Sequence, residues 1–274
     1  MYRYVLAVVI VTLAAGCTGS DRQPIIEPMP MNDEGARARY HDILERGSTV
    51  LFSGVVAYYW DTDDLFLLRE HASCEGEACF QNFSLEGVKL QILGVERGVT
   101  RVNEGSQDAN QRLWVYGGWM EDSFFATQGN QYVDPDRRRY DGLTVVRSYA
   151  VGYAPGTNPD LGALNGRWNG LMLGVDVGTW PNRGDALSGD AVVTVELAGD
   201  GMAADVSFTN IVDQLDVPRP DMTWEDLNVE AGRFGHDGGM ADNLAGAFFG
   251  ADHGEVAGTF HRDRIIGSFG GVRE

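Results

Sequence analysis

The apolar and polar positions in the second half of the chain alternate with a period of two. In residues 189–197, for example, Val193 and Val195 alternate with Thr194 and Glu196. Such alternation is typical of a strand with one buried face. Residues 204–211 alternate in the same way, and further strand-like segments lie at 166–177, 224–234, 243–249, 256–261 and 265–270. The pattern predicts sequential antiparallel strands joined by short turns.

The first half of the chain shows one helical segment and then further strands. Residues 33–46 carry Ala36, Tyr40 and Ile43 at helical spacing, and Gly47 follows as a C-terminal cap. Strand-like segments then lie at 49–59, 65–69, 83–94, 113–126 and 143–153. The sequence therefore predicts one short helix in an otherwise all-β chain.

The predicted strand at 166–177 is apolar on both of its faces. Leu171 and Leu173 share one face, and Trp168 and Met172 occupy the other. A strand with two apolar faces is covered on both sides. We therefore expect it to lie between two layers, one of them supplied by the N-terminal half.

A glycine followed two residues later by an aromatic residue recurs near the C-terminus. The copies are Gly232/Phe234, Gly246/Phe248, Gly258/Phe260 and Gly267/Phe269, with an earlier one at Gly166/Trp168. Residues two apart lie on the same face of a strand, so the ring can cover the space above the glycine. A periodic glycine-aromatic motif is a sequence sign of a closed barrel. We expect Phe248, Phe260 and Phe269 to fill the interior of this barrel.

The N-terminus has the pattern of a signal peptide. Arg3 precedes an apolar run at 5–15 that is too short to span a bilayer. The small residues before Cys17 resemble a bacterial lipobox, which implies lipidation of Cys17 and anchoring in a membrane. Thr18 stands where an aspartate would retain such a lipoprotein in the inner membrane, so the resemblance implies the outer membrane. A secretory peptide with an incidental cysteine is the alternative.

The composition is acidic and rich in glycine. The 274 residues include 40 acidic and 21 basic ones, which gives a net charge of -19, and 36 glycines. Binding to nucleic acid depends on Lys and Arg that neutralise phosphates, so we expect no nucleic-acid partner. A basic protein partner is compatible with the charge, and so is a solvated surface without a partner. Glycine at this level agrees with many turns and kinked strands.

Cys74 and Cys79 form an isolated pair in the sequence Cys-Glu-Gly-Glu-Ala-Cys. Outside the cytoplasm, two cysteines this close most simply form a disulfide that closes a short loop. A thiolate metal site would need further ligands, and only His71 lies nearby. We therefore predict the disulfide and no metal site.

The five histidines do not form a recognisable catalytic pattern. His253 lies between Asp252 and Glu255 in a predicted turn, where a metal or acid-base site is conceivable. A structural role in the turn is the alternative that we favour. His236 lies in a glycine-rich loop, which gives no rigid support for catalysis. The sequence contains no Gly-x-Ser-x-Gly nucleophile elbow, no zinc-binding His-Glu-x-x-His helix and no phosphate-binding Gly-Lys-Ser/Thr loop. We therefore expect no enzyme activity and no cofactor.

One loop stands out as a candidate contact surface. Residues 130–141 carry Arg137, Arg138 and Arg139 among several aspartates. Arginine is favoured at protein interfaces. These three arginines are therefore the candidate binding residues, and a solvated charged hairpin tip is the alternative.

Several short sequence segments resemble those of a known family of surface lipoproteins. Residues 189–196, 205–211, 244–260 and 266–270 resemble the barrel domain of transferrin-binding protein B-like lipoproteins, which factor H-binding protein and the Neisserial heparin-binding antigen share. The resemblance covers about 113–272, and its most specific part is Asp-His-x-Glu-Val-x-Gly at 252–258. It implies a filled eight-stranded antiparallel β-barrel, preceded by a smaller β-rich handle. Characterised members are lipid-anchored and bind host proteins through variable loops.

The domain organisation follows from these observations. We expect a signal peptide at 1–16, lipidated Cys17 and a flexible tether at 17–32, a short helix and β-rich handle at 33–112, and the barrel at 113–274. The function expected is a non-catalytic protein-binding module with an extracellular or host protein as partner. No segment matches the transferrin-contacting loops of the family, so transferrin is not carried over. The alternatives are a lipocalin-like carrier of a small apolar ligand or haem, and a structural envelope lipoprotein.

Overall fold

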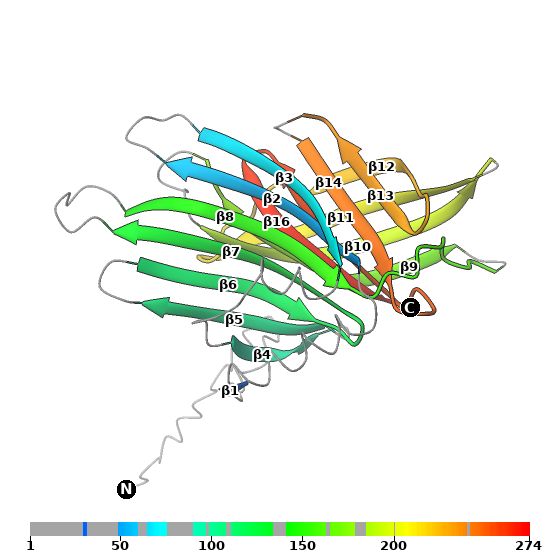
Figure 1. The fold of residues 1–274 in the computed structure, drawn as a ribbon, viewed down its shortest axis with the longest axis horizontal. Coiled ribbons are helices and arrows are strands. Elements are labelled where there is room, and N and C mark those ends of the chain that lie inside the picture. Colours follow the sequence, from blue (N-terminus) through cyan, green and yellow to red (C-terminus); the bar gives the residue numbers. More distant parts are fainter. Residues whose placement is uncertain are drawn as a thin grey trace, which may run out of the picture.

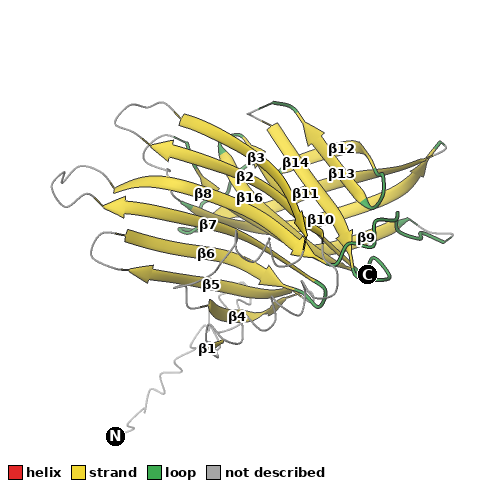
Figure 2. Ribbon diagram, viewed as in Figure 1, coloured by secondary structure: helices red, strands yellow, loops and turns green. Residues whose placement is uncertain are grey.

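The computed structural model describes the backbone of residues 30–31, 49–59, 65–75, 90–96, 99–107, 111–133, 141–162, 165–178, 185–199, 201–239 and 242–274. Side chains are described in 117–127, 148–162, 165–178, 185–199, 201–239 and 242–274. Strands and their connections make up these ranges, which contain no helix (Figures 1 and 2). None of the described residues forms a helix with the length and apolar character needed to span a membrane. The fold is all-β, and the described strands form two antiparallel sheets.

The N-terminal half forms the first sheet, which contains eight strands in the order β1-β4-β5-β6-β7-β8-β2-β3. The strands are β1 (Pro30–Met31), β2 (Thr49–Tyr59), β3 (Leu65–Glu75), β4 (Leu90–Glu96), β5 (Val99–Gln107), β6 (Gln111–Trp119), β7 (Ser123–Val133) and β8 (Asp141–Gly152). Strands β4 to β8 are neighbours in sequence order, whereas the β2-β3 hairpin pairs with β8. The sheet is therefore a meander with one hairpin added at its edge.

The C-terminal half forms the barrel, an eight-stranded sheet in the order β12-β11-β10-β9-β16-β15-β14-β13. The strands are β9 (Gly166–Asp176), β10 (Ala186–Ala198), β11 (Gly201–Asp213), β12 (Met222–Asn228), β13 (Arg233–Asp237), β14 (Asp242–Phe249), β15 (Glu255–Arg262) and β16 (Ile265–Arg273). The pairing of β16 with β9 joins the last strand to the first. The two edge strands, β12 and β13, follow each other in the chain, and a bridge between Glu230 and Arg233 connects their ends. The barrel is therefore nearly closed.

Side chains fill the barrel interior. Buried residues from all eight strands form one cluster, which includes Trp168, Leu187, Phe208, Trp224, Phe234, Phe248, Phe260 and Phe269. The ring of Phe208 lies 4.8 Å from that of Phe260 and 5.3 Å from that of Phe269, measured between centroids. Contacts at these distances are typical of packed aromatic pairs. The rings of β11, β15 and β16 thus meet across the interior.

The recurring glycines lie beneath aromatic rings, but mostly beneath those of the neighbouring strand. A Cβ atom at Gly267 would lie 2.3 Å from the ring of Phe260, its partner across the β15-β16 pair. A Cβ atom at Gly258 would lie 2.5 Å from the ring of Phe269 on the same pair. Only Gly166 is covered by the ring expected from the spacing, that of Trp168. The motif therefore works as a cross-strand device in which a ring covers a glycine on the next strand.

The first sheet covers one side of the barrel. Strands β7 and β8 pack against β15 and β16, and a second buried cluster joins the two sheets. Its members are Met120, Phe125 and Ala150 from the first sheet, and Leu171, Leu173, Ala247, Phe249 and Ala257 from the barrel. Strand β9 therefore has Trp168 and Met172 toward the interior and Leu171 and Leu173 toward the first sheet, which confirms that both of its faces are covered.

The sheet boundaries differ from those expected. The barrel was expected from residue 113, but its first strand begins at Gly166, and β6, β7 and β8 belong to the first sheet. Strand β7 buries Phe125 against the outer face of the barrel, so its sequence has an apolar face like that of a barrel strand. The expected handle is also larger than predicted, because it too contains eight strands. The helix predicted at 33–46 lies outside the described residues.

Candidate functional site

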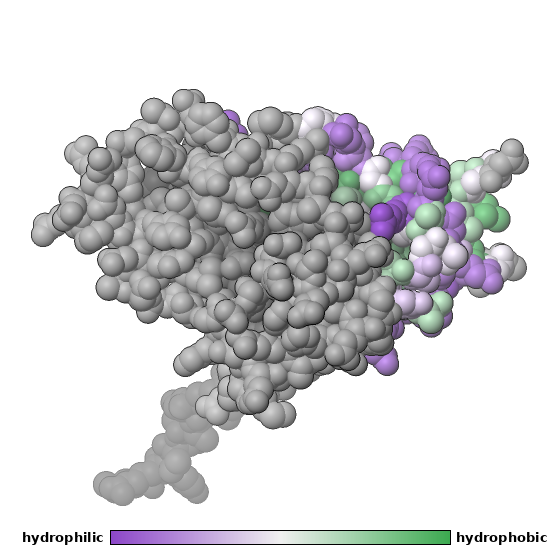
Figure 3. All heavy atoms as spheres, viewed as in Figure 1, coloured by the Kyte–Doolittle hydropathy of each residue, from purple (hydrophilic) through white to green (hydrophobic). Residues whose placement is uncertain are grey.

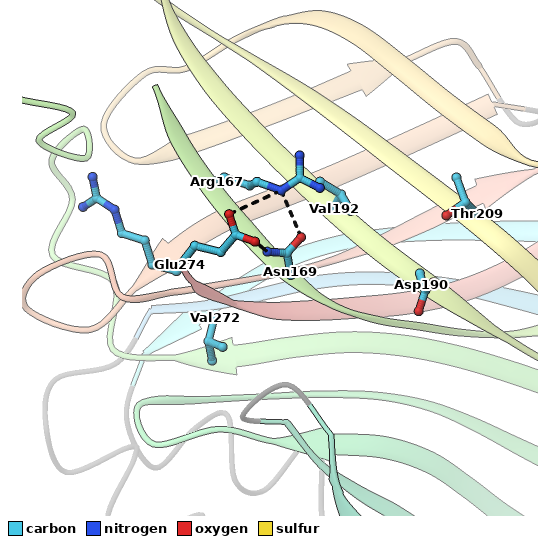
Figure 4. A pocket seen from close by; sticks show the side chains of 8 residues that line it. Arg167, Asn169, Asp190, Val192, Thr209, Val272 and Glu274 are labelled. Carbon is cyan, nitrogen blue, oxygen red and sulfur yellow. Dashed lines mark hydrogen bonds and ion pairs between the residues drawn. The ribbon is translucent and has the colours of Figure 1, made fainter. Parts of the chain in front are cut away.

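A groove runs along the outer face of the barrel. It has a volume of about 670 Å³ and is lined by Arg167, Asn169, Asp190, Val192, Thr209, Val272, Arg273 and Glu274. These residues come from β9, β10, β11 and the end of β16 (Figure 4). Strand alternation places them there, since Trp168 and Val193 point into the barrel while Arg167 and Val192 point out.

The charged groups at one end of the groove are paired with each other. The Nε atom of Arg167 lies 3.6 Å from the Glu274 carboxylate and donates to the Asn169 side-chain oxygen at 3.2 Å. The Asn169 side-chain amide in turn donates to Glu274. Figure 4 shows this group together and Asp190 and Thr209 further along the strands. Because the Arg167 and Glu274 side chains are exposed and Asn169 is only half-buried, this network adds little to stability.

The other charged residues of the groove are also engaged. The Asn210 side chain donates to Asp190 at 2.8 Å. Arg273 donates to the Asp160 carbonyl at 2.8 Å, and its guanidinium lies 5.2 Å from the centre of the Trp168 ring. The groove is thus a polar surface with its charges held in place, and two valines supply its apolar part.

The histidines considered for chemistry occupy structural positions. The His253 side chain is 7% exposed, and its Nε2 atom lies 2.8 Å from the Thr157 carbonyl oxygen and 3.1 Å from the Thr157 hydroxyl. Its own carbonyl accepts a hydrogen bond from the Trp168 indole at 2.9 Å. His253 therefore fastens the segment before β9 to the β14-β15 turn. His236 lies 3.5 Å from Asp242, and within the described residues no group of His, Cys, Asp or Glu could hold a metal ion.

The structure describes only some of the candidate residues that the sequence suggests. Phe248, Phe260 and Phe269 are buried in the barrel interior. Cys17, Cys79 and the arginines Arg137, Arg138 and Arg139 lie outside the described residues. Cys74 belongs to β3, where the backbone alone is described. The disulfide and the arginine contact surface therefore stay predictions.

The residues that line the groove were missed by the sequence analysis. The only signal of the polar ones is that they occupy the outward positions of strands, as Arg167 and Asn169 do on either side of Trp168. Every half-buried strand has such positions, so the pattern does not show which strands share a groove. The pairing of β9 with both β10 and β16 brings them together.

Figure 3 shows the character of one face of the described part of the barrel. Hydrophilic residues cover much of this face, and hydrophobic areas between them are separate. Small, separate hydrophobic areas of this kind are ordinary on a protein surface and do not by themselves mark a binding site.

The chain was compared with known proteins. It matches no protein-family model, and no curated protein matches it significantly. Among solved structures, it is similar to the N-lobe of lactoferrin-binding protein B from Moraxella bovis, with 14% identity, a TM-score of 0.34, and coverage of 83% of this chain and 99% of that one. It is also similar to a variant of transferrin-binding protein B from Actinobacillus pleuropneumoniae H49, with 10% identity, a TM-score of 0.38, and coverage of 83% and 99%. A variant of the same protein from Haemophilus parasuis Hp5 matches with 12% identity, a TM-score of 0.35, and coverage of 78% of this chain and 46% of that one.

Proposed function

We propose that this protein is a lipid-anchored outer-membrane lipoprotein that binds a protein partner without catalysis. The barrel is the scaffold, and its loops and outer face make the contacts. The observation that carries this proposal is the filled interior, where Phe208 contacts Phe260 and Phe269 from strands β15 and β16. A barrel whose core is packed with side chains recognises partners on its outside.

The same observation disfavours a lipocalin-like carrier. A carrier of an apolar ligand or haem needs an interior lined by side chains that leave space for it. Here Trp168, Phe248 and Phe234 continue the aromatic packing, with ring centroids 4.7 Å and 5.3 Å apart. The polar groove on the outer face is a better candidate for contact than the interior.

The proposed location rests on the sequence before Cys17 and is tested by replacing that cysteine. A Cys17→Ser variant should leave the membrane fraction, because it lacks the thiol that accepts the lipid. Protease treatment of intact cells should degrade the wild-type protein if it faces the exterior. A variant that stays in the membrane fraction would contradict lipid anchoring, whereas full protection from protease would place the protein on the periplasmic side.

The binding function is tested with the non-lipidated fragment 18–274. The fragment is immobilised and exposed to serum, and native mass spectra of the purified protein are recorded in parallel. We expect a protein partner to be recovered and no small molecule to co-purify. Recovery of no protein, together with a bound small molecule in the spectra, would favour the carrier instead.

A further inference from the structure

The loop between β11 and β12, residues 214–221, begins with a turn that is held by one buried carboxylate. The Asp213 side chain accepts hydrogen bonds from the backbone N–H groups of Leu215 at 2.9 Å and Val217 at 3.0 Å. The Asp213 N–H donates to the Val217 carbonyl at 3.1 Å, and the Asp216 N–H donates to the Asp213 carbonyl at 2.9 Å. These bonds hold the pKa of Asp213 below its usual value, chiefly through the Val217 N–H.

The second half of the loop is fastened to the end of the barrel. The Arg219 N–H donates to the Ile211 carbonyl at 2.8 Å. The Arg219 guanidinium lies 3.3 Å from Asp176, 3.5 Å from Asp185 and 3.2 Å from Asp213. These aspartates belong to β9, to the segment before β10, and to β11. The Arg219 side chain therefore ties the loop to β9, to β11 and to the segment before β10, and Pro218 and Pro220 restrict its backbone further.

This fixed loop exposes two aliphatic side chains. Leu215 is 75% exposed and Val217 is 50% exposed. The turn directs them outward, because the Asp213 carboxylate occupies its inner side and satisfies their N–H groups. A third exposed aliphatic residue, Leu197, is 67% exposed and lies at the opposite end of β10, near the β10-β11 turn. Single exposed hydrophobics are ordinary, but two on a short, hydrogen-bonded turn form a preorganised apolar contact.

The surroundings of this apolar pair are acidic. Asp216 lies between the two side chains in sequence and is exposed, and Asp221 is exposed at the end of the loop. Among the described residues behind the loop, the carboxylates of Asp176, Asp185 and Asp213 outnumber the guanidinium groups of Arg219 and Arg264, both of which act on Asp176. A partner that covers the loop must therefore bring positive charge to its rim.

We propose that Leu215 and Val217 are the anchor residues of a protein-binding site on the β11-β12 loop. The partner is a protein with an apolar pocket edged by Lys or Arg side chains. This inference rests on the protein-binding function proposed above and assigns that function to one loop. Because hydrogen bonds already fix the turn, binding loses little conformational entropy, and the two aliphatic side chains contribute as buried anchors.

The site is tested by site-specific photocrosslinking followed by affinity measurement. A photoreactive amino acid is placed at residue 215 or, as a matched control, at residue 197, and each full chain is incubated with serum. The protein captured at residue 215 is then purified, and its affinity is measured for the wild type and for Leu215→Asp, Val217→Asp and Leu197→Asp. Equal thermal melting of the variants shows that each one folds.

The expected result is capture at residue 215 and loss of at least about tenfold in affinity for Leu215→Asp and Val217→Asp. Leu197→Asp should bind as the wild type does, and added salt should weaken binding because the rim is charged. A partner that binds all variants equally would overturn the loop assignment and leave the proposed function standing. Failure to recover any protein by crosslinking at either position or with the immobilised fragment would overturn both.

Discussion

At the scale of single residues, the barrel interior depends on pairs of glycine and phenylalanine. Gly267 of β16 pairs with Phe260 of β15, and Gly258 of β15 pairs with Phe269 of β16. Each ring occupies space that a side chain on the opposite strand would need. Neither member of a pair can therefore change alone without leaving a void or a steric clash.

Truncation of one of these rings should destabilise the protein. We expect Phe260→Ala to lower the free energy of unfolding by about 3–5 kcal/mol, because the side chain is buried and the rings around it cannot close the cavity. Urea unfolding measures this loss, and Leu197→Ala serves as the exposed control. If Phe260→Ala kept full stability but lost partner binding, the ring would be part of a binding site.

The sequence predicts these residues better than it predicts their partners. The spacing of Gly258 and Phe260 places both on one face of a strand, which is correct. Which glycine a ring covers depends on the register between strands, and the register is set by the turns and by the packing of both faces. The groove and the Arg219 contacts could not be predicted for the same reason, since they join residues from strands that are distant in sequence.

At the scale of elements, the weak point of the barrel is the seam between β12 and β13. These strands are the two edges of the sheet, and they are bridged only near their connecting turn within the described residues. Asp226 has a φ of 56°, and the register between β11 and β12 shifts at this point. Such an irregularity bends an edge strand and interrupts its pairing. Side chains must then hold the seam where the backbone does not.

One carboxylate joins the strands on both sides of the seam. Asp242, at the start of β14, accepts hydrogen bonds from the Trp224 indole of β12 at 2.8 Å and from Arg262 of β15 at 2.9 Å and 2.7 Å. The Arg262 guanidinium also lies 4.0 Å from the centre of the Trp224 ring and donates to the Thr223 carbonyl. The three residues act as a clamp across the seam.

The Asp242→Asn variant should loosen this seam. We expect it to lose about 1.5–3 kcal/mol at neutral pH, the usual worth of hydrogen bonds to a charged group. Hydrogen bonds from Arg262 lower the pKa of Asp242, so its contribution is present above the unfolded value of about 3.9 and is lost as pH falls through the folded value. Hydrogen exchange of the β12 amides should quicken in the variant. The exposed control Asp263→Asn should leave the exchange rates unchanged. Unchanged exchange rates in Asp242→Asn would contradict the clamp.

At the scale of the whole molecule, the barrel and the first sheet share one buried interface. The apolar cluster around Phe125 and Phe249 forms most of it, and the hydroxyls of Thr127 and Ser268 meet within it at 2.9 Å. Glu255, at the start of β15, reaches the β6-β7 turn and is only 6% exposed. Its carboxylate accepts hydrogen bonds from the Glu121 N–H at 2.6 Å and the Ser123 hydroxyl at 2.6 Å. The sheets therefore behave as one unit, with an ionisable group at their junction.

This junction makes the stability of the molecule depend on pH in a defined direction. Burial raises the pKa of Glu255, and this effect outweighs the hydrogen bonds, led by that from Ser123, which lower it. The folded state therefore holds the proton more tightly than the unfolded state, whose pKa is about 4.3. The contribution of Glu255 to stability is fully present below that value and is lost as pH rises through the folded pKa.

The Glu255→Gln variant removes this titration and so isolates it. From pH 7 downward, the wild type should gain stability relative to the variant until the pH passes below about 4.3, where the difference levels off. Urea unfolding at a series of pH values measures that difference. The contributions of the other carboxyl groups with shifted pKa values, Asp176, Asp185, Asp213 and Asp242, cancel because both proteins contain them. The exposed Glu225→Gln variant should show no such trend. A difference that stays constant with pH would contradict the raised pKa, and would mean either that the hydrogen bonds to the Glu255 carboxylate fully offset its burial or that the junction between the sheets is open to water.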